Sequence, residues 1–254
     1  MEHLEQIGSG NLDHCNEWHI YGPPGCAKTT NTARQVRRAV SRFGKERVML
    51  TSFSTAAAAE LGGKDLDLPK RAIGTLHSHC FHALGMPKVA EGEVKHWDLE
   101  HPTLQITPQR SEAKMDGEES ADGDKGGDCT GDEWLGQLNR LRGRMIQREL
   151  WPLNVRKFET MWCEFKTQMG AVDFTDLIEF AHRDVKIAPG DPAVVFSDET
   201  QDFNKLMVET VSAWGRRAEY FVMALDDDQT IYGQILGADP KAIIDRKLPE
   251  EHRI

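Results

Sequence analysis

The sequence has no apolar run long enough to cross a membrane and no cysteine pair in the C-x-x-C spacing. Its five cysteines are odd in number and widely spaced, which argues against a disulfide framework or a zinc knuckle. The N-terminal residues MEHLEQIGSG are polar and acidic, without the apolar core of a signal peptide. These absences predict a protein of a reducing compartment, cytoplasmic or nuclear, with no membrane partner.

Negative charge dominates the composition, with a net charge of −10, but it is unevenly distributed. The segment 111–133 holds nine acids and two lysines, so it carries −7 and leaves only −3 for the rest of the chain. This segment is rich in Gly, Asp, Glu and Ser and lacks aromatics, which predicts a disordered surface loop. The overall acidity therefore does not exclude a local nucleic-acid groove elsewhere.

Short apolar runs alternate with helical patterns through most of the 254 residues. We predict strands at 17–21, 48–53, 194–197 and 220–225, and helices at 28–43, 55–61, 77–84, 134–150, 155–169, 173–185 and 204–214. This alternation is typical of an α/β fold with a mostly parallel sheet flanked by helices. We assign residues 1–86 and 171–254 to the α/β domain and residues 87–170 to a small inserted helical subdomain that contains the acidic loop.

The stretch YGPPGCAKTT lies between a predicted strand and a predicted helix, as a phosphate-binding loop requires. Gly22 and Gly25 allow a tight turn that points N–H groups inward, Lys28 would reach the terminal phosphates, and the Thr29 hydroxyl would bind Mg²⁺. Ala27 departs from the pattern, which has glycine at that position. The predicted nucleotide-binding positions are Gly22, Pro23, Pro24, Gly25, Cys26, Ala27, Lys28, Thr29, Thr30 and, from a later motif, Gln201.

Acidic side chains follow the predicted strand VVFS directly. Ligands of α/β proteins sit at the carboxyl ends of strands, so Asp198 would bind Mg²⁺ and Glu199 would act as the general base toward a water molecule. The next apolar strand, YFVMAL, ends in DDDQ, where the amide of Gln229 could contact a γ-phosphate or the attacking water. The sequence therefore predicts a nucleotide site with ATP and Mg²⁺ as its ligands.

Seven stretches occur in the order found in UvrD/Rep-type superfamily 1 DNA helicases, and they cover most of the chain outside the acidic loop. The chain resembles the N-terminal motor domain of these proteins, which has a RecA-like P-loop NTPase fold, in GPPGCAKTT, TSFSTAAAAEL, GTLHSHCFHALG, VDFTDLIEFA, SDETQDFN, LDDDQTIYGQILGA and LPEEHRI. The resemblance implies that Lys28 and Glu199 are catalytic, that Gln229 senses the γ-phosphate, and that Arg253 acts on it from the seam with a second motor domain.

The resemblance also places four residues on single-stranded DNA: Phe53, Thr55, His77 and Tyr232. Aromatic rings can stack on bases, and Thr55 and His77 can bond phosphates. The alternatives are a core role for Phe53 and a helix-start polar role for His77. Departures from the family pattern are Ala56, Gln234 and Ile235, which stand where relatives have a lysine, an aromatic and an arginine.

The resemblance assigns further motifs to a second RecA-like motor domain, in the same gene product or a separate subunit. We therefore expect this chain alone to hydrolyse ATP slowly and not to unwind DNA, since charge stabilisation from the opposing domain accelerates phosphoryl transfer about 10³–10⁵-fold. The alternative is a non-motor ATP- or DNA-binding module derived from a truncated helicase. A third possibility, a nucleotide kinase, lacks a recognisable phosphoacceptor lid, and RNA as the bound strand stays open.

Overall fold

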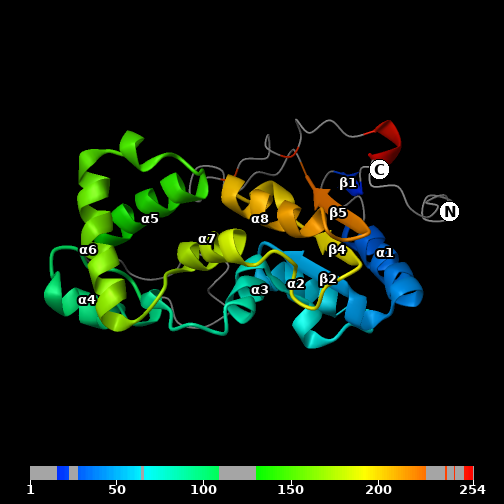
Figure 1. Cartoon of the computed structure of the whole chain (residues 1–254), viewed down its shortest axis with the longest axis horizontal. Helices are drawn as coiled ribbons and strands as arrows, with labels where there is room; N and C mark the ends of the chain where they lie inside the picture. The colour runs from blue at the N-terminus through cyan, green and yellow to red at the C-terminus, as the bar shows by residue number, and fades with distance from the viewer. Residues whose placement is uncertain are drawn as a thin grey trace.

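The structure is a computed structural model that describes residues 16–22, 28–63, 66–108, 130–226, 238, 243 and 249–253. Over these residues the strands form one five-stranded parallel sheet in the order β1-β5-β4-β2-β3 (Figure 1). The strands are β1 (Glu17–Tyr21), β2 (Val48–Ser52), β3 (Ile73–Thr75), β4 (Val194–Ser197) and β5 (Tyr220–Leu225). Because parallel strands need crossover connections, helices cover both faces. The predicted α/β fold is confirmed.

Most predicted elements agree closely with the structure. The helices are α1 (Lys28–Phe43), α2 (Thr55–Gly62), α3 (Leu76–Ala83), α4 (Val94–Glu100), α5 (Thr130–Gly143), α6 (Leu153–Met169), α7 (Phe174–Asp184) and α8 (Lys205–Gly215). Strand β3 and helix α4 were missed, since elements of three and seven residues carry too little periodicity. No helix in the described part of the chain is long and apolar enough to span a membrane.

Two boundaries in the inserted region differ from the prediction. The acidic loop was placed at 111–133, but Thr130 already begins α5, and Asp132 accepts hydrogen bonds from the backbone N–H and the hydroxyl of Thr107 at 2.8 and 2.6 Å. The helix predicted at 134–150 ends at Gly143, where a Cβ would lie 2.6 Å from the Asn204 side chain. Both differences arise from contacts with distant segments, which local periodicity does not report.

Alternate residues of the strands face opposite sides of the sheet. Val48, Leu50, Val194 and Phe196 pack with the apolar side of α1, while Met49, Val195, Phe221 and Met223 pack with α3, α7 and α8. These residues are at most 2 % exposed. The short continuous apolar runs of the sequence are therefore strands buried on both faces, as expected for a parallel sheet.

The inserted region has an apolar core of its own, formed by α4, α5 and α6. Four aromatic side chains lie at its centre, with ring centroids of Trp97 and Trp162 5.3 Å apart and those of Trp97 and Phe158 5.7 Å apart. These helices lie to one side of the sheet, beyond α7 and α8 (Figure 1). The chain enters and leaves the region side by side, because Val89 bridges Val172. Trp151 and Trp162 are buried, in agreement with the core role expected for the tryptophans of this region.

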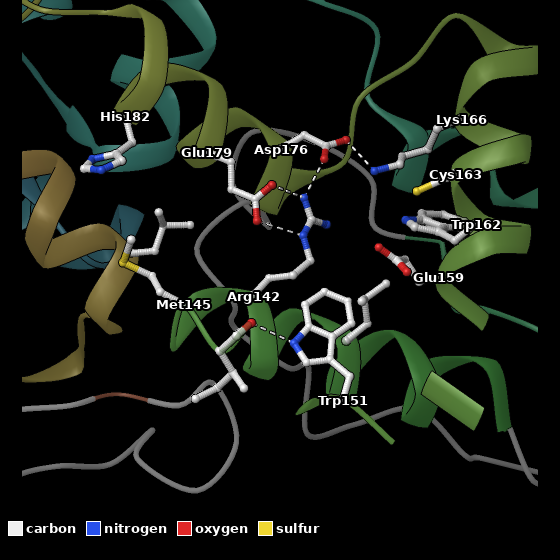
Figure 2. Close-up of a pocket in the computed structure, with 13 residues that line it drawn as sticks. Arg142, Met145, Trp151, Glu159, Trp162, Cys163, Lys166, Asp176, Glu179 and His182 are labelled. Carbon is white, nitrogen blue, oxygen red and sulfur yellow. Dashed lines mark hydrogen bonds and ion pairs between the residues drawn. The ribbon is translucent and has the colours of Figure 1, made fainter. Parts of the chain in front are cut away.

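A buried ionic cluster joins the inserted helices to α7. Arg142 of α5 donates to both carboxylate oxygens of Asp173 at 3.0 and 2.8 Å and also pairs with Asp176 and Glu179. Lys166 of α6 donates to Asp173 at 2.7 Å. It also donates to Asp176 at 2.5 Å, as Figure 2 shows. Asp173 is also the N-cap of α7, in a capping box with Asp176. One aspartate thus starts a helix and anchors two others.

Electrostatics in this cluster move two carboxyl pKa values in opposite directions. Although burial opposes ionisation, the cations Arg142 and Lys166 hold the pKa of Asp173 well below its usual range. Burial, with the nearby charge of Asp173, raises the pKa of Glu91 to about 8. Glu91 accepts a 3.1 Å hydrogen bond from the backbone N–H of Phe174 at the start of α7. Glu91 therefore keeps its proton to a higher pH than an exposed glutamate does.

We predict that Arg142→Leu lowers the free energy of unfolding by about 3–5 kcal/mol, because it removes one partner of a buried ion pair and leaves carboxylates uncompensated. The measurement is urea denaturation of the purified chain. The control is Arg148→Leu, which removes an exposed pair with Glu159 and should cost less than about 1 kcal/mol. Equal losses in the two variants would contradict the role of the cluster.

We predict that Glu91→Gln removes a pH dependence of stability. With its pKa raised in the folded chain, Glu91 retains a proton that the unfolded chain has released, so stability falls as pH rises from about 4.5 to about 8, by up to ~1.4 kcal/mol per pH unit. Unfolding free energies measured across this range should fall more steeply for the wild type than for Glu91→Gln. The control is Glu93→Gln, a change on the same turn at a partly exposed side chain, which should keep the wild-type slope of unfolding free energy against pH. Parallel curves for the wild type and Glu91→Gln would refute the raised pKa of Glu91.

Candidate nucleotide-binding site

The carboxyl ends of β1, β5 and β4 bring together residues that are far apart in the sequence. Strand β1 leads through Gly22 toward Lys28, β4 leads to Asp198 and Glu199, and β5, which lies between them, leads to Asp226. In Figure 1 the three strands lie beside one another, with α1 packed against them. In an open parallel sheet this edge is where ligands bind.

Lys28, the first residue of α1, points back across the strand ends. Its ammonium group donates to the carbonyl oxygen of Gly22 at 2.5 Å and forms an ion pair of 2.9 Å with Asp226. The side chains of Lys28 and Asp226 are 10 % and 1 % exposed, so this pair is largely shielded from water. The first turn of α1 contains no acid, which leaves the positive end of its dipole available to an anion.

Glu199 and Gln201 form the second half of the site. The Gln201 side-chain amide donates to a carboxylate oxygen of Glu199, and its carbonyl accepts from the backbone N–H of Asp226 at 3.1 Å. Glu199 has a φ of 53°, in the left-handed region that side chains other than glycine rarely adopt. The Thr200 hydroxyl donates to the carbonyl oxygen of Ala224 on β5 at 3.0 Å. The segment after β4 is therefore fixed to β5 by two hydrogen bonds.

A family comparison supports this geometry. The profile of a family described as an AAA domain matches residues 14–234. The chain belongs to this AAA domain family. The family is one of P-loop ATPases related to UvrD-like helicases, so the resemblance is confirmed at that level. No curated protein gave a significant match to the sequence.

The donor set of the AAA domain fits Mg²⁺ bound together with a nucleotide. Asp198 is 2 % exposed and continues the β2–β4 ladder, since its N–H donates to the carbonyl oxygen of Thr51 at 2.9 Å. Thr29 supplies a hydroxyl from the first turn of α1. Mg²⁺ in nucleotide sites takes one or two protein oxygens plus phosphates and water, which matches the kind and number of oxygens that these two side chains offer. Among the described residues no group of three or more His, Cys, Asp and Glu is arranged to hold a metal alone.

Several predicted site residues lie outside the described residues: Pro23, Pro24, Gly25, Cys26, Ala27, Gln229 and Tyr232. Arg253 lies within the described residues, beside β1. It bridges His19 in the middle of β1, and the preceding His252 stacks on Trp18 with ring centroids 3.9 Å apart. Arg253 is exposed along the edge strand of the sheet.

The predicted DNA contacts follow the neighbouring strands of the same sheet edge. Thr55 begins α2 after β2, and His77 lies in the first turn of α3 after β3. Burial lowers the pKa of His77 to about 4, so its ring is neutral at pH 7, and its Nδ1 has no hydrogen-bond partner among the described residues. The ring of His77 meets that of Phe174 edge-on at 6.2 Å. A neutral His77 can offer a hydrogen bond to a phosphate but no charge.

Phe53 occupies a core position. Its side chain is 5 % exposed and its ring lies 6.2 Å from that of Phe203 in the cluster beneath α7 and α8. Stacking on a base requires an accessible ring face, so this position agrees with the alternative interpretation of Phe53 as a core aromatic. Gln201 is 1 % exposed and connects Glu199 with the residue that follows β5, and its assignment to the nucleotide pocket stays a prediction.

A concavity of about 440 Å³ lies beside the ionic cluster of the inserted region (Figure 2). Among its charged lining residues, Arg142, Lys166, Asp176 and Glu179 already pair with one another, and Glu159 pairs with Arg148. A ligand that bound these charged groups would have to replace partners that they already have. The strand ends at Lys28 and Glu199 are therefore the stronger candidate site.

We predict that Phe53→Ala lowers the free energy of unfolding by about 3–5 kcal/mol, as truncation of a buried phenylalanine does. Urea denaturation measures the change, with Leu99→Ala, at an 83 % exposed side chain, as a control expected to stay within about 0.5 kcal/mol. A Phe53→Ala variant as stable as the control would show that the ring contributes little to the core and would contradict the interpretation of Phe53 as a core aromatic.

Proposed function

We propose that this AAA domain is the ATP-binding motor domain of a UvrD-like DNA helicase. It would hydrolyse ATP and, with a second RecA-like motor domain, couple hydrolysis to movement along single-stranded DNA. The observation that carries the proposal is the connected set of Lys28, Asp226, Gln201 and Glu199 across the ends of three strands. This set joins the first residue of α1 to the segments that follow β4 and β5, at the sheet edge where α/β proteins bind their ligands.

Each residue has a separate task in this proposal. Lys28 and the N-terminus of α1 bind the phosphates, while Thr29 and Asp198 hold Mg²⁺, which neutralises phosphate charge when bound. Glu199 accepts the proton of the attacking water as general base. Gln201 holds the Glu199 carboxylate in place through the hydrogen bond from its amide.

The remaining predicted residues act at the borders of this site. Gln229 would contact the γ-phosphate, and Arg253 would act from the seam with the second motor domain, on the same polypeptide or on a separate subunit. Thr55, His77 and Tyr232 would contact the DNA backbone and bases. Because Thr55 and His77 follow β2 and β3, they lie at the same sheet edge as the nucleotide residues. This common edge would offer a short path between the bound nucleotide and the single-stranded DNA.

We expect slow Mg-ATP hydrolysis by this chain, stimulated by single-stranded DNA and reduced at least about 100-fold by Glu199→Gln, because removal of a general base costs about 10²–10⁴ in rate. Lys28→Ala should weaken ATP binding itself. The measurement is phosphate release with and without a single-stranded oligonucleotide, beside Arg148→Leu as a control distant from the site.

The outcomes separate the candidate functions. ATP hydrolysis that is lost in both Lys28→Ala and Glu199→Gln supports the proposal of an active motor domain. ATP binding without turnover, alone or with DNA, would favour the alternative of a nucleotide-binding module. No ATP binding at all would overturn the proposal.

A further inference from the structure

Asp226 was assigned no role from the sequence, yet it makes the closest charged contact with Lys28. Its carboxylate lies 2.9 Å from the Lys28 ammonium, and both side chains are at least nine-tenths buried. It follows β5, the strand between β1 and β4, so it lies at the centre of the nucleotide edge. A charge pair at this depth is only weakly screened by water and salt.

A nucleotide phosphate and Asp226 would compete for the same ammonium group. The β- and γ-phosphates of a bound nucleotide are the anions that a phosphate-loop lysine contacts. The 2.9 Å pair occupies that lysine, and the buried carboxylate also repels an incoming phosphate. Binding therefore carries the free-energy cost of separating Lys28 from Asp226.

We propose that Asp226 is a positioning residue that holds Lys28 in the resting site and lowers nucleotide affinity until a phosphate displaces it. This proposal rests on the proposed ATP-binding function. Only the fraction of molecules with Lys28 released is competent to bind, so the observed dissociation constant rises in inverse proportion to that fraction.

The hydrogen bonds around Asp226 extend the effect to the general base. The backbone N–H of Asp226 donates to Gln201, and the amide of Gln201 donates to Glu199. A phosphate that takes Lys28 from Asp226 frees the carboxylate at one end of this connected set. Gln201 would then transmit the state of Lys28 to the position of Glu199.

The test is isothermal titration calorimetry of ATP, ADP and AMP with the full chain, each with Mg²⁺ and with EDTA. Asp226→Asn should tighten ATP and ADP binding about three- to tenfold, both with and without Mg²⁺, and should leave AMP unchanged, because AMP lacks the phosphates that reach Lys28. Asp226→Glu, which restores a carboxylate, should return affinity toward that of the wild type. Asp191→Asn removes an exposed pair with Arg47 and serves as the matched control without effect.

A purely structural role is separated by combining the change with Lys28→Met. If Asp226 acts through Lys28, Asp226→Asn changes ATP affinity in the wild-type background and leaves it unchanged in the Lys28→Met background. A thermal unfolding curve for each variant identifies any that fail to fold. If Asp226→Asn fails to fold, Asp226→Glu provides the comparison, because a variant that keeps the ion pair with Lys28 must not bind ATP more tightly than the wild type.

Three results would overturn the inference. If Asp226→Asn binds ATP more weakly than the wild type with Mg²⁺ but not with EDTA, Asp226 belongs to the metal site instead. Unchanged affinity, in a wild type whose binding depends on Lys28, would refute the resting pair while leaving the ATP site intact. Absence of ATP binding by the wild type would overturn the proposed function together with this inference.

Discussion

The common direction of the strands is the constraint on which the candidate site depends. Since β1, β4 and β5 run parallel, the residues that follow them emerge at one edge, although they are separated by up to about 200 positions in the chain. The parallel arrangement itself requires apolar cover on both faces, which α1 supplies on one side and α3, α7 and α8 on the other. Packing far from the site therefore determines which polar groups meet in it.

The inserted helices are attached by charge as well as by apolar contact. Arg142 and Lys166 converge on Asp173, whose backbone begins α7, and α7 in turn packs on α3 and α8. Buried ion pairs contribute little net stability relative to apolar packing, but they tolerate few alternative geometries. The cluster thus connects the inserted region to α7, which packs on α3, the helix that carries His77.

The fold was largely predictable because its strands are short apolar runs and its helices have clear ends. Strands β1, β4 and β5 and helix α1 fall at the predicted residues, and Asp173 caps α7 as its place before an apolar helix indicates. The site was predictable as a set of motifs, but its connections were not. The order of strands places β5 beside β1, which alone brings Asp226 to Lys28, and no local pattern encodes that order. The buried positions of Phe53 and Gln201 likewise depend on distant partners, Phe203 and the backbone of Asp226.

The backbone conformation of Glu199 places the stability of the fold in conflict with the proposed catalytic role of this residue. A left-handed conformation costs a residue with a side chain on the order of 1 kcal/mol, and glycine would relieve that strain. Glycine would also remove the only carboxylate that Gln201 holds by its amide among the described residues. Laboratory evolution of this chain for heat resistance alone would therefore favour the loss of its proposed base, whereas retention of glutamate at a strained position is what selection for chemistry would leave behind.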